Sequence, residues 1–407
     1  MRSVDEQLAR VLAAAVRPSP VRVETAEAQG LLCAEEVVAE RALPGAAQAA
    51  VDGYAVRGVD VRHADTEPVV LPVAGEAVAG RRQNQRLQPG QAVRVDRGAP
   101  LPTLADSVVP AADTAEHSEG VTVSRSVPSA AFVRREGDDV REGDVVVRRG
   151  TTIGPAQMAL LAAVGRDRVL VQPRPRVSVI SLGDELVDVD ARPGPEQVYD
   201  VNSYALAAAA KEAGAEVTRV GILPFEPRRL REVVEGRLLL SEIVVIAGAA
   251  GGAVGERVRS CLSELGELDT TRVAMHPGSA QGFGTLGPDR VPTFLLPAHP
   301  VSAFVGFEVL VRPLVRSALG KSNPHRRGIT AELVSPVVST KGRRGFVRGR
   351  LLRDSEGGHY LVQPVGSSDE HLLASFSEAN CLMVLDEDVV EAGPGERLRV
   401  SFLSQRS

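Results

Sequence analysis

Residues 243–256, IVVIAGAAGGAVGE, carry the strongest structural signal in the sequence. They open with four apolar, β-branched residues, a pattern typical of a strand buried on both faces of a parallel sheet. Residues 247–253 then carry no side chain larger than a methyl group, so their backbone N–H groups are accessible to a ligand. A helix is predicted from Glu256, and the junction of strand, loop and helix N-terminus is where α/β sheets bind anions. A tight turn that contacts no ligand explains the same residues equally well.

Length and composition limit the possible classes of protein. A chain of 407 residues exceeds what one hydrophobic core usually supports, so we expect two to four domains. No apolar run approaches the roughly 20 residues of a membrane helix, and the N-terminus predicts an amphipathic helix rather than a signal peptide. We therefore expect a cytoplasmic protein with no membrane partner. A net charge of −5 and an aromatic content of 3% argue against a nucleic-acid partner.

The first 173 residues predict a discontinuous domain with a second domain inserted into it. Residues 1–44 and 128–173 are expected to form a linker layer, which the chain leaves near Pro44 and rejoins after Val127. Residues 45–127 contain short strand-like pieces with turn residues between them, which predicts an inserted, mostly-β domain.

Residues 174–326 change character, because buried strands alternate with helices of ten residues or more. Such a βαβ series predicts a doubly wound α/β domain with a parallel sheet, whose ligands bind at the carboxyl ends of the strands. Residues 327–407 return to strands with glycine turns and predict a C-terminal β-barrel. The expected α/β strands are residues 176–182, 216–223, 243–246, 272–275 and 293–296, and the other expected helices are residues 204–213, 226–239 and 301–319.

Ten short motifs occur in a fixed order along the chain. They are VDGYAV at 51, GAPLP at 98, GDDVREGD at 137, SLGDEL at 181, YDVNSY at 199, AVGE at 253, HPGSAQGFG at 276, LPAHPVSAF at 296, FVRG at 346 and GSSDEHLLASFSEAN at 366. This ordered set resembles the molybdopterin molybdenumtransferase family, which is MoeA in bacteria and the gephyrin E domain in animals. The resemblance covers nearly the whole chain.

The resemblance implies a multidomain α/β plus β fold of four domains and a homodimer. Its active site would lie between the α/β domain of one subunit and the inserted domain of the other. There, adenylylated molybdopterin would react with molybdate to give molybdenum cofactor and AMP, with Mg²⁺ as the metal cofactor.

The resemblance also implies roles for individual residues. Glu185, Asp52 and Asp139 would be catalytic, and Glu185, Asp184 and Glu256 would hold the metal. The implied substrate-binding residues are Asp184, Asp200, Asn202, Gly251, Gly252, Gly255, His276, Ser279, Pro297, His299, Ser302, Arg348 and Ser367.

Several of these residues have structural explanations that remain open. A carboxylate such as Glu185 also suits the N-terminus of a helix, where it interacts with the helix dipole. Asn202 suits a helix cap, and Asp52 suits a turn before glycine. Arg348 lies in a segment that is equally well a plain barrel strand.

The sequence departs from the family pattern at positions expected to contact ligand. Val258 stands where the family has an aspartate, and His276 and Ser279 replace the lysines of a KPGKP turn. His299 replaces an asparagine. Each lost lysine removes charge-assisted hydrogen bonds of about 1.5–3 kcal/mol, and a histidine replaces that charge only when it is protonated. A neutral imidazole that fills a loop is an alternative for both histidines.

The sequence is therefore compatible with two functions. The first is an enzyme that inserts molybdate into adenylylated molybdopterin. The alternative is a non-catalytic or altered-specificity homologue that binds pterin or nucleotide, or that partners a true insertase. A nucleotide-binding oxidoreductase is disfavoured, because the first βα turn reads SLGDEL and lacks the GxGxxG spacing.

Overall fold

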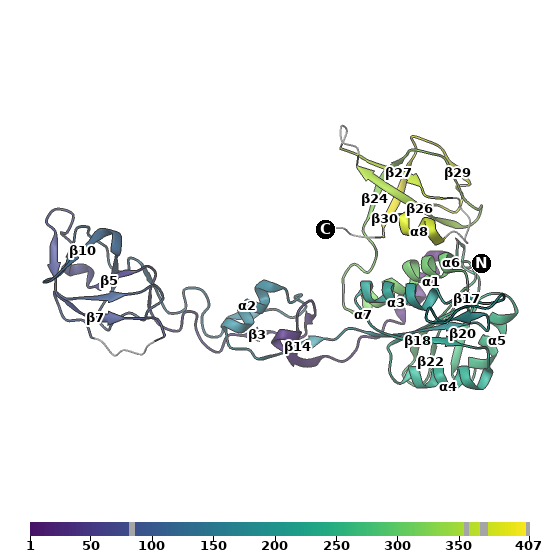
Figure 1. Ribbon diagram of the computed structural model, residues 1–407, viewed down its shortest axis with the longest axis horizontal. Helices are drawn as coiled ribbons and strands as arrows, with labels where there is room; N and C mark the ends of the chain where they lie inside the picture. The colour runs from purple at the N-terminus through teal and green to yellow at the C-terminus, as the bar shows by residue number, and fades with distance from the viewer. Residues whose placement is uncertain (81–85, 354–357, 367–372, 404–407) are drawn as a thin grey trace. The chain divides into compact units, whose positions relative to one another are not determined.

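The computed structural model describes residues 1–80, 86–353, 358–366 and 373–403 (Figure 1). The chain divides into two compact units, of which the first comprises Met1–Pro20 with Gln172–Ser407 and the second comprises Val21–Val171. In the described part of the chain, no helix is both long enough and apolar enough to span a membrane.

A six-stranded sheet in the order β18-β15-β19-β23-β22-β20 forms the centre of the first unit. Four neighbouring strands run parallel, and at one edge β22 runs antiparallel both to its neighbour β23 and to the outermost strand β20. The strands are β15 Arg176–Leu182, β18 Glu216–Leu223, β19 Ile243–Ala247, β20 Gly266–Asp269, β22 Gly282–Leu286 and β23 Val291–Leu296. A two-stranded ribbon, β16 Leu186–Val187 with β17 Val198–Tyr199, follows β15.

Helices cover both faces of this sheet, as Figure 1 shows, so the α/β domain is doubly wound. One face packs against α3, α6, η4 and α7, and the other against α4 and α5. The helices are α3 Asn202–Ala213, α4 Pro227–Leu238, α5 Gly252–Leu262, α6 Pro300–Gly306, the π-helical η4 Phe307–Val311, and α7 Arg312–Ala318. The β-branched strand predicted at residues 243–246 is therefore confirmed as part of β19, in the interior of the sheet.

The antiparallel edge of the sheet was missed, and the prediction of a sheet strand at residues 272–275 was wrong. Those residues lead into β21 Met275–His276, which pairs with a strand of the barrel instead. The edge strands β20 and β22 escaped notice because glycines weaken the strand pattern. A Cβ at Gly284 would lie 1.9 Å from the Glu267 carbonyl oxygen, so close strand pairing requires glycine there.

The C-terminal region closes into a five-stranded barrel in which each strand pairs with two others. The barrel strands are β24 Gly328–Leu333, β26 Arg344–Arg353, β27 Tyr360–Pro364, β28 Cys381–Leu385 and β30 Arg397–Phe402. The remaining elements of this region are β25 Val337–Val338, α8 Leu373–Glu378 and β29 Glu391–Ala392. The predicted barrel is therefore confirmed.

The second unit is built from small sheets, helix α2 and short 3-10 turns. Pairing of β1 with β14 and of β3 with β13 joins the two chain segments of the discontinuous layer. The segment between them forms four-stranded and three-stranded sheets with the orders β7-β8-β5-β9 and β10-β11-β6, and β4 pairs with β12. The elements are β1 Val21–Glu24, η1 Thr25–Glu27, β2 Leu32–Cys33, β3 Val37–Val38, β4 Gln48–Ala49, β5 Gly53–Val56, η2 Gly58–Asp60, β6 Val69–Leu71, β7 Val73–Ala77, β8 Ala92–Val95, β9 Ser107–Pro110, η3 Ala111–Asp113, β10 Thr114–His117, β11 Gly120–Val123, β12 Val133–Arg134, β13 Val145–Val147, α2 Pro155–Ala163 and β14 Arg168–Gln172.

The N-terminal helix α1, Val4–Ala13, belongs to the first unit, although its sequence suggested a place in the linker layer. Ser3 and Glu6 form a capping box at its start, and Val11 is buried in the same cluster as α3 and α7. An amphipathic helix packs on whichever apolar surface is available, so its sequence does not specify its partner. The fold class is confirmed, whereas the four domain boundaries stay predictions.

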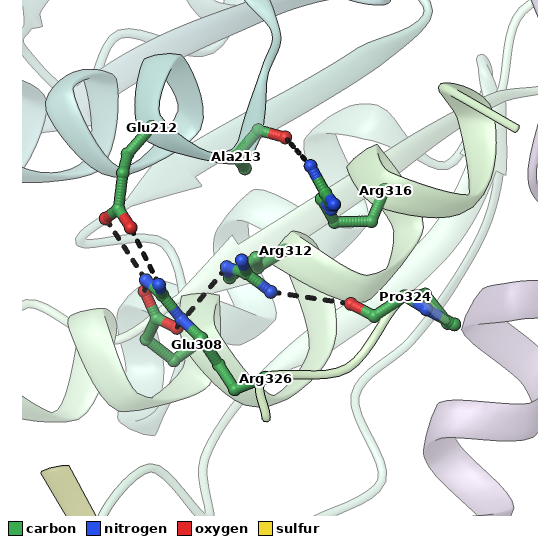
Figure 2. Close-up of polar contacts among 7 residues, drawn as sticks. All are labelled: Glu212, Ala213, Glu308, Arg312, Arg316, Pro324 and Arg326. Carbon is green, nitrogen blue, oxygen red and sulfur yellow. Dashed lines mark hydrogen bonds and ion pairs between the residues drawn. The ribbon is translucent and has the colours of Figure 1, made fainter. Parts of the chain in front are cut away.

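A buried ion network holds the linker between α7 and the barrel against the α/β helices (Figure 2). Arg326 donates hydrogen bonds to both carboxylate oxygens of Glu308, at 2.9 and 3.0 Å, and pairs with Glu212 of α3 at 2.7 Å. The Glu308 side chain is only 2% exposed. Burial lowers the pKa of Arg326, but its hydrogen bonds with Glu308 and Glu212 outweigh that effect and raise the pKa above its usual value.

Two further arginines surround this pair. Arg312 lies 3.8 Å from Glu308 and donates to the Pro324 carbonyl oxygen, while Arg316 donates to the Ala213 carbonyl oxygen. Burial, with the nearby Arg326 charge, lowers the pKa of Arg312 to about 10. Glu308 is therefore the carboxylate that lies between two guanidinium groups.

Replacement of Glu308 by glutamine is expected to destabilise the first unit by about 3 kcal/mol, because two buried arginines lose their shared countercharge. Calorimetric melting should show a decrease of about 6–12 °C for a unit of this size. Glu264→Gln is the control, since its pair with Arg231 is largely exposed, and it should cost less than about 1 kcal/mol. Equal melting temperatures for the two variants would contradict the role of Glu308.

Candidate functional site

The strand order creates a crevice between the carboxyl ends of β15 and β19. Helix α3, which follows β15, lies on one face of the sheet, and α5, which follows β19, lies on the other. A crevice at such a topological switch point is the usual ligand site of an open α/β sheet. A pocket of about 210 Å³ occupies this place, and its lining includes Glu185, Tyr199, Asn202, Gly248 and Ala298.

Gly248 permits the close approach of strands at the floor of this pocket. Its φ is +81°, and a Cβ there would lie 2.1 Å from the Leu182 carbonyl oxygen. No L-residue with a side chain fits without moving β15 or β19. The small residues after Ala247 are thus explained by packing at this position, in addition to any contact with a ligand.

A second pocket, of about 170 Å³, lies at the N-terminus of α5 and includes Gly251, Gly252, Gly255 and Glu256. The helix begins at Gly252, four residues before the predicted start at Glu256. Gly251 adopts φ +91° and Gly252 φ +57°, so the chain enters the helix through glycine conformations that the sequence pattern did not reveal. The structure therefore brings the predicted glycines to one helix N-terminus, which favours anions.

Arg272 lines the second pocket and was not predicted as a site residue. It is exposed, and within the described residues no ion pair engages its side chain. Gln281 lines the same pocket. The available signal was the position of Arg272 four residues before His276, in a segment that was interpreted only as a strand.

The three predicted metal ligands do not form one cluster. Asp184 and Glu185 follow β15 and are exposed, and Asp184 accepts a hydrogen bond from the Phe225 backbone N–H at 2.9 Å. Glu256 pairs instead with Arg259 of its own helix at 2.9 Å. Among the residues that the structure describes, no group of three or more His, Cys, Asp or Glu side chains is arranged to hold a metal.

Asp200 and Asn202 lie at the start of α3. Asp200 is 1% exposed and accepts hydrogen bonds from the Ser181 hydroxyl at 2.7 Å and from the Ser203 backbone N–H at 3.1 Å. Asn202 donates its side-chain amide to the Ala298 carbonyl oxygen at 2.7 Å, across the first pocket. Asp200 therefore caps the helix, while Asn202 is a lining residue that joins α3 to the end of β23.

The turn that carries His276 and Ser279 lies against the barrel. His276 pairs in register with Gly345 of β26, the strand that also carries Arg348. Ser279 is 8% exposed and donates its hydroxyl hydrogen bond to the Val273 carbonyl oxygen at 2.8 Å. That donor stabilises the turn itself, which is a structural reason for serine where the family has lysine.

Arg348 is 4% exposed and lies on the same face of β26 as Phe346, which packs with Met275 and Val305 of the α/β region. That face of the barrel is therefore the one turned toward the His276 turn.

The remaining predicted residues are spread over the chain. His299 is exposed and precedes α6, Pro297 is half-buried, and Ser302 is buried within α6. Ser367 lies outside the described residues. None of these three described residues lines the two pockets above.

Asp52 and Asp139 lie in the second unit, and both are exposed. Asp52 accepts a hydrogen bond from the Arg97 backbone N–H at 2.6 Å, and its carbonyl accepts one from Ala111 at 3.1 Å. These bonds match the alternative of a turn aspartate before Gly53. Catalytic roles for both residues stay predictions.

Val258 is fully buried on α5, among the apolar residues between that helix and the sheet. A carboxylate at this position would have to leave water without a compensating partner. The departure from the family pattern at Val258 is thus compatible with a well-packed core.

Three family models match successive parts of the chain: "MoeA N-terminal region (domain I and II)" at residues 2–165, "Probable molybdopterin binding domain" at 178–317, and "MoeA C-terminal region (domain IV)" at 330–403. The chain is 58% identical to a Mycobacterium tuberculosis protein named molybdopterin molybdenumtransferase 1, over 100% of both sequences. It is 36% identical to molybdopterin molybdenumtransferase 2 of that organism, over 98% of the chain and 99% of the relative. A crystal structure of a Pyrococcus horikoshii molybdopterin biosynthesis MoeA protein superposes with a TM-score of 0.83 at 30% identity, over 99% of both chains.

Arg272→Gln is expected to weaken binding of inorganic pyrophosphate at the α5 pocket at least about tenfold, because one charge-assisted hydrogen bond contributes about 1.5–3 kcal/mol. Isothermal titration calorimetry measures the change. Arg272→Lys, which keeps the charge, should lose less affinity. Arg290→Gln, at the amino end of β23 and thus the opposite edge of the sheet, should lose none. Unchanged binding by Arg272→Gln would remove Arg272 from the anion site.

Proposed function

The chain belongs to the MoeA family of molybdopterin molybdenumtransferases, and on that basis we propose that it inserts molybdate into adenylylated molybdopterin and releases AMP. The observation that carries the proposal is 58% identity over the whole length of a relative with that name. Such similarity over every domain favours a shared activity more strongly than the isolated departures at His276, Ser279 and His299 favour a changed one.

The two pockets suit the two parts of an adenylylated pterin. The switch-point pocket, with an apolar wall and the polar groups of Glu185 and Asn202, suits a flat heterocycle that is held at its edge. The α5 pocket offers backbone N–H groups from Gly251 and Gly252 together with the Arg272 guanidinium. We assign it to a phosphate group or to molybdate, both of which are oxyanions.

Asp184 and Glu185 are the residues we propose for Mg²⁺. Mg²⁺ commonly uses only one or two protein carboxylates and completes its octahedron with water and substrate phosphates, so a larger carboxylate cluster is not required. The two exposed carboxylates at the carboxyl end of β15 fit that pattern. Glu256 fits it less well, because Arg259 already pairs with it. When bound, Mg²⁺ would neutralise negative charge that develops on the phosphate.

The charge of the lost lysines is replaced only in part. Arg272 supplies a permanent cation at the α5 pocket, whereas the Ser279 hydroxyl is committed to Val273. The alternative function, a homologue with altered specificity, rests on that deficit. Turnover with molybdate separates the two functions.

Glu185→Gln is expected to slow the molybdate-dependent release of AMP from adenylylated molybdopterin strongly in the presence of Mg²⁺. A loss of about 3 kcal/mol of charge stabilisation corresponds to about a hundredfold decrease in rate. Stability should be unchanged, because the side chain is exposed. Glu216→Gln, at the amino end of β18, is the matched control and should remain active.

An inactive parent would eliminate the transferase function and favour the non-catalytic alternative. An active parent with an equally active Glu185→Gln variant would eliminate only the metal assignment.

We also propose a homodimer whose site is completed by Asp52 and Asp139 of the second unit of the other subunit. Large apolar side chains are exposed beside the pockets, with Val198 55%, Tyr199 45% and Val254 42% exposed. Exposed apolar side chains at a site suit coverage by a partner. Multi-angle light scattering at micromolar concentration should give twice the mass of the 43.0 kDa chain. A monomer at that concentration would exclude a composite site.

A further inference from the structure

A polar cluster outside the two pockets joins the β16–β17 ribbon to the α/β core. Asp188 directly follows β16, Tyr204 lies on α3, and Arg219 lies on β18. Tyr204 donates its hydroxyl hydrogen bond to one oxygen of Asp188 at 2.6 Å, and Arg219 donates to the other at 3.0 Å. The Arg219 guanidinium also lies 4.0 Å from the centre of the Tyr204 ring. Both oxygens of Asp188 are thus engaged by groups of the core.

The same arginine reaches inward to the buried capping carboxylate. Its second terminal nitrogen donates to the Ser203 hydroxyl oxygen at 3.2 Å, and that hydroxyl donates its own proton to Asp200. Ser203 is fully buried and Asp200 is 1% exposed. Hydrogen bonds therefore run in one direction, from the guanidinium at the surface to the carboxylate at the start of α3.

The segment that Asp188 anchors forms one wall of the switch-point pocket. Leu186, Val198 and Tyr199 of the ribbon line the pocket beside Glu185. Little apolar burial holds this wall in place, since Val198 is 55% and Tyr199 45% exposed. A segment with few buried apolar contacts opens locally at low free energy unless polar contacts restrain it.

We propose that Arg219 is a positioning residue for the switch-point pocket: it fixes the ribbon through Asp188, and thereby the pocket wall that the ribbon forms, without touching the ligand. This inference rests on the proposed function in so far as the ligand is the pterin substrate. Lysine cannot replace this arginine, because one planar fork makes the bonds to Asp188 and Ser203 while it stacks on Tyr204.

Hydrogen bonds from Tyr204, from the Val189 backbone and from Arg219 hold the pKa of Asp188 below its usual range. Asp188 is therefore ionised at neutral pH, and the anchor is present under ordinary assay conditions.

The experiment compares Arg219→Lys with the parent in two measurements. In the free protein, the rate of amide hydrogen exchange in residues 186–199 should rise at least about tenfold, whereas the rate in the six-stranded sheet should be unchanged. In turnover with adenylylated molybdopterin, molybdate and Mg²⁺, KM for the pterin substrate should rise about tenfold while kcat changes less than about twofold, because the variant loses binding that the ground state and the transition state share. Tyr204→Phe keeps the ring and removes one bond to Asp188, so it should show a smaller rise in both.

Arg176→Lys is the matched control. Arg176 forms a similar pair with Glu242, but at the amino end of β15, away from the pocket. This variant should match the parent in both measurements.

Unchanged exchange in residues 186–199 would overturn the inference whether or not the protein turns over substrate. Increased exchange throughout the α/β sheet would also overturn it, because Arg219 would then act on stability alone. If exchange rises locally in Arg219→Lys but the parent shows no turnover, the inference stands and the proposed function is removed.

Discussion

The parallel pairing of β15 with β19 is the interaction on which the α/β region and its pockets depend. Both strands are buried on both faces, and their side chains belong to the two apolar clusters that hold the helices. At their carboxyl ends, Gly248 brings the backbone so close to Leu182 that no Cβ fits between the strands. The helices leave this point on opposite faces, and the space between them is the pocket. Glu185 and the α5 glycines are therefore placed by strand pairing rather than by contacts of their own.

Local sequence was informative where one residue type satisfies several demands at once. The β-branched strand at residues 243–246 was predicted correctly, because burial on both faces restricts the choice of side chain, as close approach does at Gly248. The order of the regions was predictable because ten different motifs occur along the chain in the order of the family it resembles. The predictions that were wrong concern segments whose packing partners are distant in the sequence. Surfaces far away in the sequence determine whether α1 packs on the linker layer or on the α/β core. They also determine whether residues near Met275 join the α/β sheet or pair with the barrel.

Candidate site residues show the same division. Glu185 lines the pocket at the carboxyl end of β15, the edge at which a parallel sheet is expected to bind ligand, whereas Gly252 and Gly255 lie inside α5, which begins four residues before the predicted start. Arg272 was missed, because residues 272–275 were interpreted as a sheet strand, and the strand pattern does not show that the Arg272 side chain faces the α5 pocket. Conversely, the sequence suggested that Ser279 replaces a ligand-binding lysine and loses its contact. In the structure, the Ser279 hydroxyl donates a hydrogen bond inside the turn. A departure from a family pattern thus has two possible physical origins: the residue contacts a different ligand, or it stabilises the local backbone in a different way. Only the geometry distinguishes the two.

The pairing of β21 with β26 also bears on how far the parts of this chain are interchangeable. By sequence, the barrel begins after a simple linker, so it looks like an independent module that could be removed or exchanged. In the structure, Met275 is fully buried against Phe346, and the first residues of β26 supply the hydrogen-bonding edge for β21. A chain shortened before β24 would leave that two-residue strand with unpaired N–H and C=O groups beside the His276 turn. A barrel taken from a relative would need a matching edge at the same register, so the two regions are constrained to diverge together.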